Sequence, residues 1–301
     1  MDSLTFSRRV RTALAVGMLA CVSLGSAGAA PFASTRITVR TEGTGPDVIL
    51  IPGLNSSPRA WESTVAALPG YRFHLVQVAG FGGQPAGGNK TGDVAASVAE
   101  EIARYIRVAG VKQPAVIGHS LGGSIGLMLA ARHPAALSRL MVVDIFPYMG
   151  VMFGGPTATP AQVAAIADRI ATGMRGASAG QRAALASKTI DGMVGNVAMR
   201  AVALQDTLAS DPDVGARAYR ELIVTNLIPE LHRITVPVTV LYVQPNSVPL
   251  PAAQFDRGYQ TAYAPIRKLT IKRIPDAAHF IMWDQPQRFQ AEVTAFLAGA
   301  K

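Results

Sequence analysis

The sequence predicts an α/β protein whose mostly parallel central sheet has helices on both faces and a helical cap inserted between two strands. Two observations lead to this fold class. Short apolar runs alternate with longer segments of helical periodicity, which is the pattern of a parallel sheet covered by helices. Residues 147–235 lack strand character, and the strand pattern returns after them. We therefore expect a core made from residues 30–146 and 236–301, and a cap made from residues 147–235.

The core elements can be placed in order along the chain. Before the cap, apolar or alternating runs predict strands at residues 37–41, 48–51, 73–78, 115–117 and 140–145, and helical spacing predicts helices at 59–68, 93–109 and 120–133. After the cap, the same patterns predict strands at 238–243 and 268–274 and a last helix at 286–298. The run from Val48 to Ile51 is apolar at every position, which is typical of a strand that is buried on both faces.

The first 29 residues have the order of a secretory signal peptide. Three arginines precede an apolar stretch, and small residues follow it up to Ala29. We expect cleavage after Ala29 and export to the periplasm or the medium, by either the general or the twin-arginine route. The apolar stretch is shorter than the ~20 residues of a membrane span, so no stable membrane insertion is expected after cleavage. Lipid anchoring at Cys21 is the alternative, because the preceding residues weakly resemble a lipoprotein box.

Composition narrows the function classes. The chain has 301 residues, of which 49% are hydrophobic, so it can bury a sizeable core and is not disordered. Its single cysteine, which lies in the signal segment, excludes an internal disulfide and a multi-cysteine metal site. The net charge of +9 falls to about +7 without residues 1–29, and the basic residues are scattered rather than interleaved with aromatics. We therefore expect no nucleic-acid partner.

The segment Gly118-His119-Ser120-Leu121-Gly122 contains the pattern G-x-S-x-G between a predicted strand and a predicted helix. This context is that of a nucleophile elbow, in which a tight turn exposes a serine hydroxyl. The turn needs small residues two positions before and after the serine, and Gly118 and Gly122 meet this need. The alternative is a structural glycine-rich turn. We expect Ser120 to be a nucleophile, with the positive end of the following helix beside it.

A serine nucleophile requires a base to accept its proton. Of the five histidines, His119 in the elbow and His133 at a helix end are expected to be structural, His74 begins a predicted strand, and His232 lies where the cap returns to the core. His279 follows the last strand and precedes the last helix, in a loop at the carboxyl edge of the sheet. We expect His279 to be the general base, the alternative being a histidine that caps a helix or fills the core.

These motifs together resemble the α/β-hydrolase fold superfamily, in its capped, serine esterase or lipase-like form, over about residues 36–300. The matching pieces are Ile51-Pro52-Gly53-Leu54, Gly80-Phe81-Gly82, the Ser120 elbow, Val143-Asp144-Ile145 and Ala278-His279-Phe280. The resemblance implies a serine–acid–histidine triad in that chain order and no cofactor or metal. It also implies an oxyanion hole of two backbone N–H groups, those of Leu54 and Leu121.

The acid of the triad departs from the family's usual pattern. The family usually carries it in the turn after the penultimate strand, where this chain has Asn246. An asparagine cannot stabilise an imidazolium by charge. Some members carry the acid after the strand that follows the nucleophile helix, and Asp144 has that position. We expect Asp144 to be the acid, with Asp256 and Asp276 as lesser candidates.

The expected protein is an exported serine hydrolase that cleaves a small-molecule carboxylic ester through an acyl-enzyme. A hydrophobic acyl or alcohol group is expected, because the cap region carries adaptable apolar side chains: Phe146, Met149, Met152, Phe153, Met174, Met193 and Met199. The alternatives are an aminopeptidase-type peptidase that holds the substrate amine with Glu221 or Glu230, a cofactor-free haloperoxidase or carbon–carbon bond hydrolase, and a non-catalytic binding protein. The oligomeric state is left open.

Overall fold

The central sheet has seven strands in the part of the chain that the computed structural model describes, residues 32–245 and 248–299. The predicted signal segment and Asn246 lie outside this part. The strands are β1 (Ile37–Gly43), β2 (Asp47–Ile51), β3 (Arg72–Val78), β4 (Ala115–His119), β5 (Arg139–Val143), β6 (Val238–Tyr242) and β7 (Leu269–Arg273). Their order is β1-β3-β2-β4-β5-β6-β7, and every neighbouring pair is parallel except β1 with β3. The predicted fold class is confirmed.

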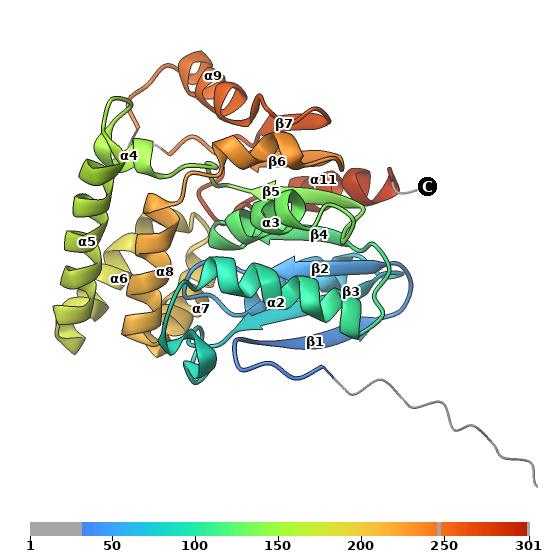
Figure 1. The fold of residues 1–301 in the computed structure, drawn as a ribbon, viewed down its shortest axis with the longest axis horizontal. Coiled ribbons are helices and arrows are strands. Elements are labelled where there is room, and N and C mark those ends of the chain that lie inside the picture. The colour runs from blue at the N-terminus through green and yellow to red at the C-terminus, as the bar shows by residue number, and fades with distance from the viewer. Residues whose placement is uncertain (1–31, 246–247, 300–301) are drawn as a thin grey trace, which may run out of the picture. The chain divides into compact units, whose positions relative to one another are not determined.

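Helices cover both faces of this sheet, and the pleat of the strands divides the core between them. Ile49 and Ile51 of β2 pack in the cluster that includes α2 (Ala95–Val108), α3 (Leu121–Arg132) and α9 (Ala252–Tyr263). Val48 and Leu50 point the other way, toward α1 (Glu62–Ala67), α10 (Ile281–Asp284) and α11 (Pro286–Ala298). Figure 1 shows α2 and α3 in front of the sheet. The two faces explain why β2 is apolar at every position.

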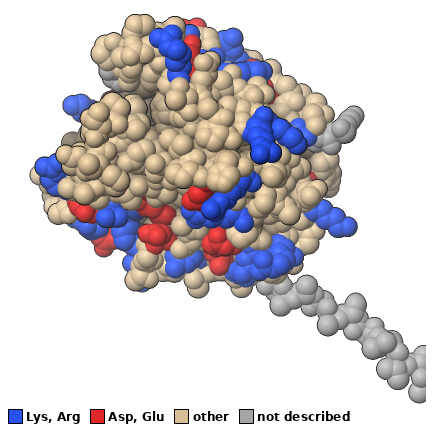
Figure 2. Space-filling view, turned by 45° about the horizontal axis from the view of Figure 1, so that its top comes forward, with Lys and Arg blue, Asp and Glu red and all other residues tan. Residues whose placement is uncertain are grey.

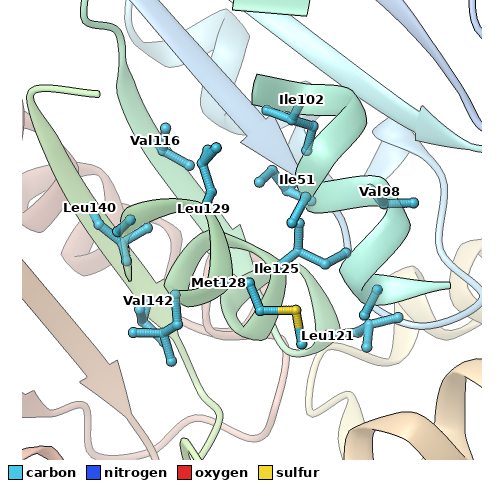
Figure 3. Packing of buried hydrophobic residues seen from close by; sticks show 14 of the residues in the cluster. Ile51, Val98, Ile102, Val116, Leu121, Ile125, Met128, Leu129, Leu140 and Val142 are labelled. Carbon is cyan, nitrogen blue, oxygen red and sulfur yellow. The ribbon is translucent and has the colours of Figure 1, made fainter. Parts of the chain in front are cut away.

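The helix that follows Ser120 is the most deeply buried one in the core. Every residue of α3 from Leu121 to Ala131 is buried. Its side chains interlock with those of β2, β4, β5 and α2, as Figure 3 shows. A helix held on all sides gives a rigid base to the turn at its first residue.

The chain between β5 and β6 contains no strand within the described residues. It forms α4 (Gly150–Gly154), α5 (Pro160–Gly176), α6 (Ala179–Met193), α7 (Val197–Ala209) and α8 (Pro212–Val224), followed by the 3-10 helix η3 (Ile228–Arg233). Capping boxes start two of these helices, Thr159 with Gln162 at α5 and Ser178 with Gln181 at α6. These helices lie at the end of the sheet where the parallel strands finish (Figure 1). The smaller helices of the core are η1 (Pro58–Trp61) and η2 (Gly87–Lys90).

Basic side chains are spread over the surface. On the face in Figure 2, several Lys and Arg side chains lie beside Asp or Glu. Ion pairs of the described residues include Arg132–Glu230 and Arg220–Asp168. None of the helices within residues 32–299 that the structure describes combines the length and the apolar character that crossing a bilayer requires.

Candidate active site

Ser120 lies in a sharp turn between β4 and α3. β4 ends at His119, α3 begins at Leu121, and Ser120 between them has φ 53° and ψ −122°. Its backbone N–H donates to the Val143 carbonyl at 2.8 Å, which fixes the turn to β5. An L-residue in this conformation stores about 1–3 kcal/mol of strain, and such strain is common where a side chain must be presented for chemistry.

Gly118 and Gly122 are required because backbone carbonyl groups approach them too closely for any other residue. A Cβ at Gly118 would lie 2.1 Å from the Gly122 carbonyl oxygen, and one at Gly122 would lie 2.3 Å from the Ile51 carbonyl oxygen. Both distances are too short for any side chain. The turn therefore explains the small residues on either side of Ser120.

Asp144 and His279 are joined although they are 135 residues apart. Asp144 follows β5 with φ 54°, and His279 lies in the loop between β7 and α10. The Asp144 Oδ2 atom lies 2.6 Å from His279 Nδ1. A proton on Nδ1 satisfies this bond and leaves the lone pair of Nε2 free to accept another proton.

The carboxylate of Asp144 is buried and has further donors. Its Oδ1 atom accepts a hydrogen bond from the Val243 backbone N–H at 2.9 Å, and the Tyr259 hydroxyl lies 3.5 Å away. Val243 is the first residue after β6, the strand that usually precedes the family's acid. Here that strand end supplies a backbone donor that holds the carboxylate in place.

His119 connects the serine turn to the histidine loop. Its Nε2–H donates to the backbone carbonyl of His279 at 3.0 Å, and the two rings lie 4.6 Å apart. Burial, and to a lesser extent the nearby His279, lowers the pKa of His119 well below its ordinary value, so this ring stays neutral. Within the described chain no hydrogen bond joins the Ser120 hydroxyl to His279. Hydrogen bonds of this kind are often long in ligand-free sites and tighten when substrate binds.

The two expected oxyanion donors lie at the same edge of the sheet. Leu121 is the first residue of α3, so its N–H has no partner within the helix. Leu54 follows β2 in a turn closed by a hydrogen bond of 3.2 Å from Ser56 N–H to the Gly53 carbonyl. Asn55 has φ 55°, the feature that a type II turn requires at its third residue. A Cβ at Gly53 would lie 3.2 Å from the Ser120 Cβ, so this turn directly adjoins the serine.

The other sequence candidates have structural partners elsewhere. His74 is buried between the Tyr105 hydroxyl and Asp47, at 2.6 and 2.7 Å. Asp256 accepts a hydrogen bond from the Tyr242 hydroxyl at 2.6 Å. Asp276, with φ 57°, shapes the turn before His279. The structure therefore brings together Ser120, Asp144, His279, Leu54 and Leu121.

The two glutamates considered for a peptidase are both engaged. The buried carboxylate of Glu221 in α8 accepts hydrogen bonds from three backbone N–H groups at the start of α2, at 2.6–2.8 Å, those of Val94, Ala95 and Ala96. Glu230 receives two hydrogen bonds of 2.9 Å from the Arg132 guanidinium. Neither carboxylate is left to hold a substrate amine.

Three residues of the site region have no signal in the sequence. Asp206 of α7 contacts Ser57, just after the turn that carries Leu54, and Ser210, just after α7, lies beside Asn55 in that turn. Asp284 accepts hydrogen bonds from the N–H groups of Ala278, Gly195 and Asn196 and so ties the His279 loop to the cap. Except for Ala278 with Asp284, the two residues of each pair are at least 88 positions apart, and a single aspartate leaves no periodic pattern in the sequence. In the ranges 32–245 and 248–299, no group of three or more His, Cys, Asp and Glu is arranged to hold a metal ion.

A model of the alpha/beta hydrolase family matches residues 48–292 of the chain. The chain belongs to the alpha/beta hydrolase family. The resemblance predicted from the sequence motifs is thereby confirmed, and the match includes the elbow, the cap and the histidine loop.

Relatives and solved structures agree with the family. The chain is 32% identical over 115 residues to a putative carbamate hydrolase RutD of Yersinia enterocolitica, with 38% of this chain and 41% of that protein covered. It is 36% identical over 115 residues to a pimeloyl-[acyl-carrier protein] methyl ester esterase of Aeromonas hydrophila, with 37% and 42% covered. The chain thus spans about two fifths of the length of these relatives. The enol-lactonase of Burkholderia xenovorans LB400 shares its fold with a TM-score of 0.71 and 19% identity, over 87% of this chain and 96% of that one.

Proposed function

We propose that this protein is an exported serine hydrolase that cleaves small-molecule carboxylic esters through an acyl-enzyme. The observation that carries this proposal is the 2.6 Å contact between Asp144 and His279 at the sheet edge where the strained Ser120 turn lies. The names of the two relatives, a methyl ester esterase and a putative carbamate hydrolase, support hydrolysis of this kind.

The reaction follows from the roles of these groups. His279 Nε2 accepts the hydroxyl proton of Ser120 while Oγ attacks the carbonyl carbon of the ester. The N–H groups of Leu54 and Leu121 stabilise the oxyanion, and the first turn of α3 adds its positive potential. The imidazolium, stabilised by Asp144, protonates the leaving alcohol, and water then hydrolyses the acyl-enzyme by the reverse use of the same groups. The chemistry needs no cofactor.

A hydrophobic acyl or alcohol group is the proposed substrate feature. Leu54, Phe146 and Met149 are apolar, partly buried and adjacent to the strand ends that carry the reacting groups. Two of the cap methionines expected to line a pocket, Met152 and Met193, are 48% and 37% exposed, so they are not enclosed in this structure. We expect kcat/KM to rise from acetate to longer acyl esters, because apolar contact area near the carbonyl increases binding.

Hydrolysis of p-nitrophenyl esters of increasing acyl length tests the proposal. We expect the purified chain to turn them over and Ser120→Ala to lose at least about a thousandfold in kcat, as removal of a serine nucleophile does elsewhere. Ser187→Ala, an exposed serine of α6, is the matched control and should match the wild type.

Other outcomes would favour the alternatives. Equal turnover by the wild type and Ser120→Ala would remove the serine mechanism. Turnover of aminoacyl-naphthylamides without ester turnover would favour the peptidase, although Glu221 and Glu230 are already engaged. Halide oxidation or carbon–carbon cleavage without ester turnover would favour those chemistries, and no turnover at all would favour a binding protein.

A further inference from the structure

A buried aspartate of the cap holds the loop that follows β2. Asp206 of α7 is 6% exposed and lies 149 residues after Ser57 in the sequence. Its Oδ2 atom accepts two hydrogen bonds from Ser57, one from the backbone N–H at 3.0 Å and one from the hydroxyl at 2.6 Å. Arg59 lies 3.4 Å from Oδ1. A buried carboxylate is costly without such partners, so this pair fixes the loop firmly to α7.

Two more contacts hold the turn that carries Leu54. The Ser210 hydroxyl, just after α7, donates to the Asp206 carbonyl at 2.8 Å, accepts a hydrogen bond from the Gly82 N–H at 2.9 Å and packs 3.3 Å from the Asn55 carbonyl oxygen. On α8, a Cβ at Gly215 would lie 2.8 Å from the Asn55 Oδ1 atom. The absence of a side chain at Gly215 therefore leaves room for the side chain of Asn55, the residue with positive φ in this turn.

We propose that α7 and α8 of the cap position the Leu54 oxyanion donor, with Asp206 as the principal positioning residue. Leu54 follows Gly53, which adjoins Ser120. It precedes Asn55 and Ser57, which both contact the cap. An oxyanion donor is effective only within a few tenths of an ångström of its ideal position. The contacts that fix the position of its turn therefore affect catalysis directly. This inference rests on the proposed ester hydrolysis. It gives the cap a role in positioning an oxyanion donor, in addition to any role in binding the substrate.

Variants of Asp206 test the inference through the split between kcat and KM. The oxyanion forms only in the transition state, so loosening its donor should lower kcat and leave KM nearly unchanged. For Asp206→Ala we expect kcat to fall about tenfold to a hundredfold, less than the loss of a whole donor. Both Ser57 bonds end on one oxygen, so the amide oxygen of Asp206→Asn can accept both and should restore most of kcat. Asp191→Ala, an exposed ion-pair partner of Arg200, is the control and should match the wild type.

A second variant does not remove any buried polar group. Gly215→Ala adds one methyl that displaces the Asn55 side chain, and it should lower kcat severalfold while the helix itself gains stability. Gly173→Ala in α5 is its matched control, because a Cβ there meets nothing within 4 Å. If Asp206→Ala fails to fold, Gly215→Ala and Ser57→Ala still decide the question.

The outcomes separate this inference from the proposed function. A wild type without ester turnover overturns both. An active wild type whose Asp206→Ala, Ser57→Ala and Gly215→Ala variants keep the kcat of their controls overturns the inference alone. A change confined to KM also overturns it, because that result would mean that these contacts affect substrate binding and not the oxyanion donor. A fall in kcat with KM within about twofold, together with recovery in Asp206→Asn, supports it.

Discussion

At the scale of single residues, unusual backbone conformations mark the carboxyl edge of the sheet. Four residues other than glycine have positive φ just after a strand: Asn55 after β2, Ser120 after β4, Asp144 after β5 and Asp276 after β7. Only one further such residue, Gln113, occurs in the described chain, and it precedes β4. Asn and Asp tolerate this region, whereas Ser120 does so at a cost. Strain is therefore concentrated where the proposed chemistry takes place.

The assignment of the acid is a prediction at this scale. We expect Asp144→Asn to lower kcat by about a thousandfold to ten-thousandfold, because the amide can neither stabilise the imidazolium nor maintain the Nδ1–H tautomer. Steady-state ester hydrolysis measures this loss. Asp256→Asn is the control, since Asp256 contacts Tyr242 and Arg273 instead of His279. A larger loss in Asn246→Ala than in Asp144→Asn would move the role to the turn after β6.

At the scale of elements, the cap is attached to the core by polar contacts at several separate places. Asp206 holds the loop after β2, Asp284 of α10 holds the cap segment before α7 at Gly195 and Asn196, and Glu230 of η3 holds the end of α3 through Arg132. Each contact joins a short loop or helix end of the core to a segment that comes much later or earlier in the chain. The segments around the candidate site are thus fixed by side chains as well as by the sheet.

The Arg132–Glu230 ion pair should make the free energy of unfolding depend on pH. Hydrogen bonds from Arg132 hold the pKa of the Glu230 carboxyl below its ordinary value of about 4.5. Its stabilising contribution is therefore full above pH 4.5 and is lost as the pH falls through the lower, folded-state pKa. We expect Glu230→Gln to lower the free energy of unfolding by about 1 kcal/mol at pH 7. Urea unfolding of both proteins at pH 7 and near pH 3 measures this, and the difference should shrink at the acid pH.

The control for this prediction is Asp191→Asn, whose carboxylate is 57% exposed beside Arg200. An exposed pair contributes little, so its variant should unfold like the wild type at both pH values. A Glu230→Gln difference that stays constant from pH 7 to pH 3 would show that the carboxylate's charge is not involved.

At the scale of the whole molecule, the sequence predicted the sheet and missed the helices α9 and α10 and the 3-10 helix η2. Every strand expected from an apolar or alternating run is present, with boundaries that shift by at most two residues. Helix α9 was not predicted, although Phe255, Tyr259 and Tyr263 recur every four residues along it. This aromatic spacing was the available signal, and it stacks the helix against Phe146 and Tyr242 beside Asp144.

The site was predictable to the extent that its residues follow strands. The elbow pattern and the positions of Asp144 and His279 depend on local order along the chain, and a parallel sheet brings its carboxyl ends together. The contacts of Asp206, Asp284 and His119 depend instead on where the cap and the last loop pack. A pair 149 residues apart, such as Ser57 and Asp206, leaves no periodic pattern in one sequence.

Export is also a property of the whole chain, and it remains a prediction. We expect the exported protein to begin at Ala30, because Ala27 and Ala29 supply the small residues that signal cleavage needs. Intact-mass measurement on protein from the periplasm or medium of an expressing bacterium checks the site. Ala29→Arg should block cleavage, and Cys21→Ser should change nothing. A Cys21→Ser variant that leaves the membrane fraction while the wild type stays there would establish lipid anchoring.

The contact between Glu221 and α2 has a consequence for the order of folding. The carboxylate that satisfies the first N–H group of this helix lies 127 residues further along the chain. A chain that emerges from its N-terminus makes β1 to β5 and α2 long before it makes α8. Until then, the first turn of α2 depends on water for its unpaired N–H groups. The first turn of α2 therefore reaches its final hydrogen bonding only after α8 has packed against it.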